Sequence, residues 1–146
     1  MLESMFLATV LAFLSALIHA LGLLGLLYWQ TRQWPDLEAN FRPRRNLPTF
    51  LLLFGVILTL HWIEVSLWAG VYFWRHWLPS WESSLYFSAT SYSATGYGDI
   101  LLPRAWRLVG VMESITVVLL LGWSAGFFFT VVYRFFEIRI RHWQRQ

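Results

Sequence analysis

Two glycines that flank a tyrosine, Gly96 and Gly98, are the residues of this chain whose spacing most clearly predicts chemistry. Glycine adopts backbone angles that are closed to other residues, so a short run that contains both can aim successive carbonyl oxygens in one direction. Rings of such carbonyls, contributed by several copies of a chain, replace the water shell of a dehydrated cation. The segment TGYGDI, residues 95–100, therefore predicts a backbone that coordinates cations.

Three apolar runs surround this segment, and each is long enough to cross a hydrocarbon core. They predict an N-terminal transmembrane helix in residues 1–30, an outer helix at about 49–74 and an inner helix at about 104–136. A shorter helix at about 81–92, with Ser80 as its N-cap, precedes the glycines. Non-helical backbone at membrane depth is tolerated only where protein buries it or where it lines a water-filled path. We therefore predict an all-α membrane protein with three transmembrane helices plus a re-entrant pore helix and a selectivity-filter loop.

Composition and charge agree with a membrane location, since 58% of the 146 residues are hydrophobic and 13% are charged. Eight of the eleven basic residues, all of them arginines, lie in residues 32–45 and 134–145. A re-entrant segment returns to the side it left, so these two arginine-rich segments share the other side, which the positive-inside rule makes cytoplasmic. We expect a multi-pass protein of the cell (inner) membrane with the N-terminus outside, a cytoplasmic connector at 31–47 and a cytoplasmic tail at 139–146.

The stretch YFSATSYSATGYGDI, residues 86–100, resembles the pore helix and signature filter of the potassium-channel pore-domain family. The order of outer helix, pore helix, filter and inner helix is also similar, over about residues 49–133. The later stretch LLLGWSAGFFF, residues 119–129, is similar to small bacterial members with one additional N-terminal transmembrane helix. The resemblance implies a pore domain at 48–138. It also implies a homotetramer, because one chain carries one pore repeat and a filter needs rings.

Carried over by position, the resemblance implies that K⁺ passes the filter carbonyls of Thr95, Gly96 and Tyr97. The residues implied for the ion-binding filter are Ala94, Thr95, Gly96, Tyr97 and Gly98. Those implied for its mouth and support are Asp99, Tyr86 and Phe87. Ala94 stands where the family has a threonine whose hydroxyl helps to form the innermost ion site, and Thr95 replaces a valine or isoleucine. We expect a complete row of carbonyls with a weakened inner site.

Four ionisable residues fall inside the apolar runs: His19, His61, Glu64 and Glu113. Counted along helices from the ends of the runs, they lie about 14 to 21 Å deep. Because ionisable groups at such depth are costly and usually paired, we predict an intramembrane polar cluster built from His19, His61 and Glu64. Glu113 either joins this cluster or bonds the back of the pore helix near Thr90 or Ser91.

The role of that cluster stays open at the level of sequence. A histidine within it could make conduction sensitive to pH. A permanently paired structural contact is an equal alternative, and a metal site made of His19, His61 and Glu64 is a weaker one.

The inner helix carries two glycines around a serine and three phenylalanines after them. Gly122 and Gly126 could permit bending, and Phe127 or Phe128 could form a hydrophobic constriction that gates the path. Helix packing or contact with lipid is the alternative for these phenylalanines.

The function predicted is a tetrameric potassium-selective, or potassium-preferring, ion channel. Its expected partners are further copies of itself, the lipid bilayer and permeant monovalent cations, with no nucleic acid and no cofactor besides K⁺ as the permeant ion. We expect no enzyme, because the chain has no cysteine and His61 and Glu64 lack the HExxH spacing. A non-selective cation channel, or a non-conducting accessory membrane subunit related to channels, remains as the alternative.

Overall fold

The computed structural model describes residues 2–39 and 43–144, with the side chains of residues 2–32, 47–141 and 143–144. Secondary structure in these residues is helical, and the elements are α1 (Leu2–Ala39), α2 (Pro43–Trp74), α3 (Trp81–Tyr92), the 3-10 turn η1 (Arg104–Trp106) and α4 (Arg107–Gln144). Three stretches are long and apolar enough to cross a membrane: Leu2–Arg32, Leu47–Trp74 and Arg104–Arg141. The predicted all-α membrane fold is confirmed.

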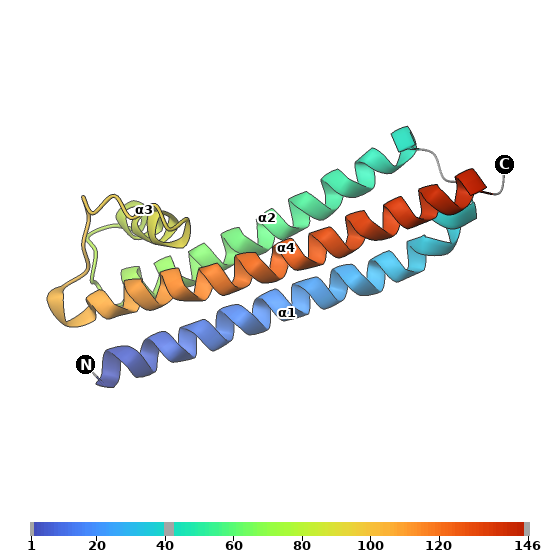
Figure 1. Cartoon of the computed structure of the whole chain (residues 1–146). Helices are drawn as coiled ribbons and strands as arrows, with labels where there is room; N and C mark the ends of the chain where they lie inside the picture. The colour runs from blue at the N-terminus through green and yellow to red at the C-terminus, as the bar shows by residue number, and fades with distance from the viewer. Residues whose placement is uncertain (1, 40–42, 145–146) are drawn as a thin grey trace.

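The three long helices lie side by side, and α3 folds back at the end of the bundle where the N-terminus lies (Figure 1). α1 packs against both α2 and α4, whereas α2 and α4 contact each other much less. Small residues let α1 approach closely. A Cβ atom on Gly22 would lie 2.4 Å from Cδ2 of Leu60, and the Ser15 hydroxyl accepts a hydrogen bond from the Trp68 indole at 3.0 Å. Packing among the three long helices therefore runs mainly through α1.

Two apolar clusters pack the long helices together on either side of a polar layer. The first combines Ala8 and Leu11 of α1 with residues of α2 and α4 that include Trp68, Tyr72 and Val109. The second combines Leu23 and Leu26 of α1 with Leu53, Val131 and Phe135. Because lipid tails are as apolar as leucine, such clusters stabilise the bundle by close packing more than by removal from water. Buried polar side chains, among them His19, lie between them.

The segment between α2 and α4 leaves the bundle and returns to it at nearly the same place. α2 ends in a Schellman motif, in which His76 has a φ of +54° and the Trp77 N–H donates to the Tyr72 carbonyl at 3.0 Å. Ser80 then caps α3 by accepting from the Ser83 N–H at 3.1 Å, as its sequence position predicts. The Trp77 and Trp106 rings stack with centroids 4.4 Å apart, which joins the two ends of the segment.

Two helical regions extend beyond the bounds predicted from sequence. Residues 31–39, expected to belong to a connector, continue α1, and α2 begins at Pro43 instead of at about residue 49. The apolar pattern marks where a helix meets lipid and not where the helix ends. Proline is also favourable at the first helical position, because the N–H it lacks has no partner there. Residues 40–42 of the predicted connector lie outside the described residues.

α4 likewise runs to Gln144, through most of the tail predicted at 139–146. Ion pairs along the helix support this extension, since Glu137 lies 2.9 Å from Arg134 and 3.8 Å from Arg141, at helical spacings. Residues 145–146 of the predicted tail lie outside the described part of the chain.

Candidate functional site

α3 runs from the end of the bundle toward its middle. At the start of α3, Trp81 lies edge-on to Phe73, with ring centroids 6.1 Å apart. At its last residue, the Tyr92 hydroxyl contacts His61 and Glu64, about 15 Å further along α2 at helical rise. The buried residues of α3 are spaced four apart and form one face: Ser84, Ser88 and Tyr92. The next residues of the chain therefore begin partway along the length of the bundle, at its surface.

The C-terminal end of α3 is closed by the residues that follow it. The Ala94 N–H donates to the Ser91 carbonyl at 3.1 Å, and the Thr95 N–H donates to the Thr90 carbonyl at 3.0 Å. This is a Schellman motif with Ala94 at the position that glycine usually occupies. Ala94 accordingly has a φ of +56°, and the Gly96 N–H adds a second bond to Thr90 at 3.0 Å. The predicted filter is thus joined to the helix before it through backbone hydrogen bonds.

The backbone of residues 94–98 alternates in the sign of φ. It is positive at Ala94, Gly96 and Gly98, with values of +56°, +53° and +76°. It is not positive at the two residues between them, Thr95 and Tyr97. Such alternation places successive N–H groups on one side of the chain and successive carbonyls on the other. Among the described residues, no hydrogen bond uses a carbonyl of residues 94–98 as its acceptor. These residues are exposed on the single chain, so their carbonyls are available to a ligand.

Hydroxyl groups hold both ends of this segment. At the end farther from α3 the Tyr86 hydroxyl donates to Oδ2 of Asp99 at 2.9 Å, and this bond raises the pKa of Tyr86, which keeps it a donor. At the inner end the Ser93 and Thr95 hydroxyls lie 2.8 Å apart. The Ser93 hydroxyl also lies 3.2 Å from the Thr90 carbonyl. Tyr86 and Asp99, predicted as support and mouth, are therefore in contact.

Phe87 supports α3 from the side of the long helices. Its ring meets the Tyr72 ring edge to face, with centroids 5.3 Å apart and planes at 78°. On its other side, a Cβ atom on Gly110 of α4 would lie 2.9 Å from Cζ of Phe87. The glycine is therefore what allows α4 to approach the ring. Phe87 also lines a hollow of about 410 Å³ between α3, residues 94–102 and α4.

Glu113 bonds the back of α3, but not at the residues predicted from sequence. Its carboxylate accepts from the Ser88 hydroxyl at 2.5 Å and from the Tyr72 hydroxyl at 2.7 Å. The prediction of Thr90 or Ser91 as its partner is wrong, because Ser88 belongs to the buried face of α3 that Glu113 meets. Ser91 is instead bonded through its carbonyl, which accepts from the neighbouring Ser114 hydroxyl at 2.9 Å.

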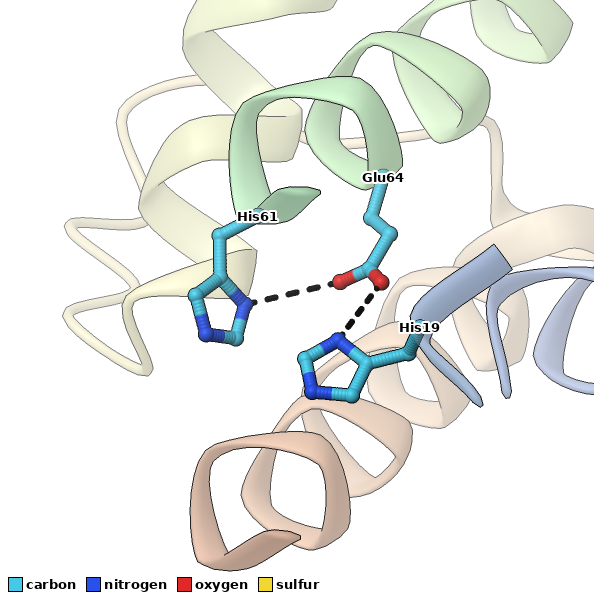
Figure 2. A group of neighbouring side chains, drawn as sticks. All are labelled: His19, His61 and Glu64. Atoms are coloured by element: carbon cyan, nitrogen blue, oxygen red, sulfur yellow. Dashed lines mark hydrogen bonds and ion pairs between the residues drawn. The ribbon is translucent and has the colours of Figure 1, made fainter. Parts of the chain in front are cut away.

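The structure brings together His19, His61 and Glu64, which come from two helices (Figure 2). Glu64 lies between the histidines: its Oε1 is 2.9 Å from Nδ1 of His19, and its Oε2 is 3.4 Å from Nδ1 of His61. Glu64 and His19 are fully buried. The fourth candidate, Glu113, has the separate partners described above.

Two members of this cluster were missed by the sequence prediction. The Tyr92 hydroxyl donates to Glu64 and lies 2.6 Å from Nδ1 of His61. The Ser124 hydroxyl lies 3.1 Å from Nε2 of His61 and 2.9 Å from Nε2 of His19. A signal for Tyr92 exists in the four-residue spacing of Ser84, Ser88 and Tyr92, whereas a lone serine within an apolar helix gives no such signal.

The geometry of the three residues also bears on metal binding. One ligand atom from each of His19, His61 and Glu64 lies within 4.8 Å of the others, a separation that a metal ion could bridge. Each of these side chains already has a hydrogen-bond partner within the protein, so none of them needs an ion as a partner.

The predicted hinge and constriction residues lie on different faces of α4. Cβ atoms on Gly122 and Gly126 would meet no atom within 4 Å, so both glycines face open space on the single chain. Phe127 packs against the apolar cluster around Leu23 and Leu26, and Phe128 is half-buried. Phe129 is the most exposed of the three phenylalanines, at 71%. The roles of these residues stay predictions.

Comparison with known families matches residues 47–134, about three fifths of the chain, to a family described as "Ion channel". Comparisons with curated proteins and with solved structures give no significant match. The matched residues contain most of α2, all of α3, the segment with alternating φ and most of α4, while α1 lies outside them. The chain therefore belongs to the ion channel family of two-transmembrane pore domains.

Proposed function

We propose that this chain is one subunit of a homotetrameric channel that conducts K⁺ in preference to Na⁺ past the carbonyls of residues 94–98. The observation that carries the proposal is a run of backbone carbonyls without a partner among the described residues. An unpaired carbonyl at membrane depth is costly, and a dehydrated cation supplies the missing partner. The negative C-terminal end of the α3 dipole lies next to this run and favours a cation there.

A ring of subunits would also cover surfaces that the single chain leaves open. The exposed surfaces include residues 94–99, the hollow of about 410 Å³ beside them and one face of α4, which presents Ile115 and Leu119. A cyclic arrangement gives every copy the same neighbours, so one surface can cover another around a closed ring. Four copies would place four equivalent carbonyls at each level of the path.

The orientation proposed is that residues 75–104 and the N-terminus face outward across the cell (inner) membrane. An ion pair of Glu3 with Arg75, at 3.4 Å, is consistent with both lying at the same end of the bundle. The C-terminal ends of α1 and α4 and the start of α2 lie at the opposite end (Figure 1), and the arginine-rich parts of the sequence fall there, so the positive-inside rule assigns this end to the cytoplasm.

The test is cation flux from liposomes that contain the purified full-length protein. Gly96→Ala is expected to abolish K⁺ flux, because a φ of +53° is strained for alanine and the carbonyl alternation depends on it. Gly55→Ala is the matched control, since it adds the same methyl group to an exposed position of α2 with no atom within 4 Å. The control should conduct like the wild type.

The relative flux of K⁺ and Na⁺ distinguishes a potassium-selective channel from the alternative functions. Greater flux of K⁺ than of Na⁺ supports the proposal, and equal flux of both would replace it with a non-selective cation channel. Absence of flux in wild type and variants alike, over a range of pH and potential, would favour a non-conducting accessory subunit.

A further inference from the structure

Five side chains form a closed ring of hydrogen-bond contacts that joins all four α-helices. In order around the ring they are Glu64, His19, Ser124, His61 and Tyr92, and Tyr92 returns to Glu64. The distances are 2.9 Å from Glu64 to His19, 2.9 Å from His19 to Ser124, 3.1 Å from Ser124 to His61 and 2.6 Å from His61 to Tyr92. The Tyr92 hydroxyl donates to Glu64 and closes the ring.

The ring has five hydrogen-bond contacts but only four protons to share among them when Glu64 is ionised and both histidines are neutral. A hydrogen bond needs one proton, and an ionised carboxylate supplies none, whereas a neutral histidine, a serine and a tyrosine supply one each. With Glu64 ionised and both histidines neutral, four protons serve five contacts. One further proton, held by Glu64 or by either histidine, completes the ring and leaves it without net charge.

In the state with four protons, one of the five contacts has no proton, and the strengths of the hydrogen bonds indicate which one. Hydrogen bonds to an ionised carboxylate are roughly twice as strong as those between neutral groups, so His19 and Tyr92 continue to donate to Glu64. The unfilled contact then falls on one of the other three. Two of those three are the contacts of Ser124, which is the member of the ring that α4 contributes.

We propose that this ring is a proton-binding site within the membrane, and that its fifth proton ties α4 to α1 and α2. Loss of that proton as pH rises releases one contact, most often at α4. The consequence for conduction rests on the proposed channel function, because α4 is the helix that follows the filter; the proton-binding itself does not.

The ring has few titratable neighbours among the described residues. Those that face it from the packed helices are its own His19, His61, Glu64 and Tyr92, and Glu113 of α4, which acts on Tyr92 through space and has its own partners. Histidine is the side chain whose charge ordinarily changes near neutral pH, so a test of the ring has to span that region.

Two substitutions separate the state in which every contact of the ring has a proton from the state in which the contacts of α4 are lost. Glu64→Gln supplies a donor and an acceptor in nearly the same shape, so five neutral groups fill five contacts at any pH. Ser124→Ala removes both α4 contacts and leaves three contacts served by three protons, so it has no gap to fill. Thr116→Val is the matched control, because it removes a buried α4 hydroxyl that bonds only the Met112 carbonyl of its own helix.

The primary measurement is the thermal unfolding temperature of the full-length protein in detergent between about pH 5 and pH 9. The wild type should lose roughly 2–4 °C across this range, the shift expected from one hydrogen bond in a chain of this size. Glu64→Gln should remain at the low-pH value and Ser124→Ala at or below the high-pH value, both without pH dependence. Thr116→Val should keep the wild-type dependence.

Other outcomes would overturn the proposal. A wild-type pH dependence retained in Glu64→Gln or in Ser124→Ala would place the titrating group elsewhere, and failure of Glu64→Gln to fold would contradict a completed ring. Stabilisation of the wild type, but not of Glu64→Gln, by added Zn²⁺ after chelator treatment would assign the cluster to a metal instead.

Flux measurements then separate the two proposals of this article. In liposomes, Glu64→Gln should conduct at every pH as the wild type does at low pH, and Ser124→Ala as the wild type does at high pH. A flux that Gly96→Ala abolishes but that shows no such pattern would reject the link between the proton site and conduction, whereas an unfolding temperature of the wild type that does not change with pH would reject the proton site itself. A pH pattern in unfolding without any flux would reject the channel alone.

Discussion

Ala94 carries a conformation that its side chain does not favour. It lies at the end of α3 with a φ of +56°, in the left-handed region, which costs a residue with a Cβ atom about 1–2 kcal/mol. The two hydrogen bonds that end α3, from the N–H groups of Ala94 and Thr95, depend on this conformation. The inner end of the candidate filter is therefore held against local backbone preference.

Ala94→Gly is expected to relieve this strain. Part of the relieved strain is offset, because glycine makes the unfolded chain more flexible. The net gain in the free energy of unfolding, about 0.5–1 kcal/mol, should raise the unfolding temperature by roughly 1–4 °C. The measurement is thermal unfolding in detergent. Ala89→Gly, the same change within α3, should lower the temperature instead, and a fall for both variants would contradict the strained conformation of Ala94.

Single residues also show how far sequence reasoning reaches. The glycines at 96 and 98 and the polar groups at 19, 61 and 64 could be identified because lipid penalises both irregular backbone and ionisable groups. Counting along a helix gives the depth of a residue but not the direction in which it points. For that reason Ser88 as the partner of Glu113, and Ser124 in the ring, emerged only from the structure.

Among the elements, the position of α3 depends on the close packing of its Phe87 ring against Gly110 of α4. Phe87 lies between the Tyr72 ring on one side and Gly110 on the other, and Tyr72 is in turn bonded to Glu113. The ring therefore has little room to retreat if α4 gains a side chain at this point.

Gly110→Ala is expected to destabilise the protein, because its Cβ atom would lie 2.9 Å from Cζ of Phe87. Overpacking of this kind costs about 1–3 kcal/mol, against a gain of up to about 1 kcal/mol in helix propensity. Thermal unfolding should show a loss for Gly110→Ala and none for Gly55→Ala.

A second substitution identifies the cause. Phe87→Leu shortens the side chain that the new methyl group meets, so the double variant Phe87→Leu with Gly110→Ala should be more stable than the sum of the single effects predicts. Strictly additive effects would mean that the ring and the glycine do not constrain each other.

The limits of the helices were less predictable than their existence. The predicted bounds of α3 at 81–92 match the helix, because the N-cap Ser80 acts locally and the two glycines follow soon after its end. The ends of α1 and α4 follow no such signal. Arginines and prolines beyond the apolar runs suggested a connector and a tail, but helices can continue into water when ion pairs such as Arg134 with Glu137 support them.

At the scale of the whole molecule, the exposed carbonyls and the open hollow beside them predict assembly. Native mass spectrometry of the detergent-solubilised protein is expected to give a complex of four copies of the 17.2-kDa chain. A stable monomer or dimer under conditions that preserve flux in liposomes would contradict a filter built from four chains.

The position of α1 has a consequence for how the family fold is completed here. α1 lies outside the matched residues 47–134, yet it packs against both α2 and α4 and contributes His19 between them. Being covalently attached, it meets its binding surface at an effective concentration of the order of millimolar, so weak contacts suffice to keep it in place. The chain thus contains, in one polypeptide, both the matched pore domain and a helix that packs against it, so no separate binding step is needed to bring the two together.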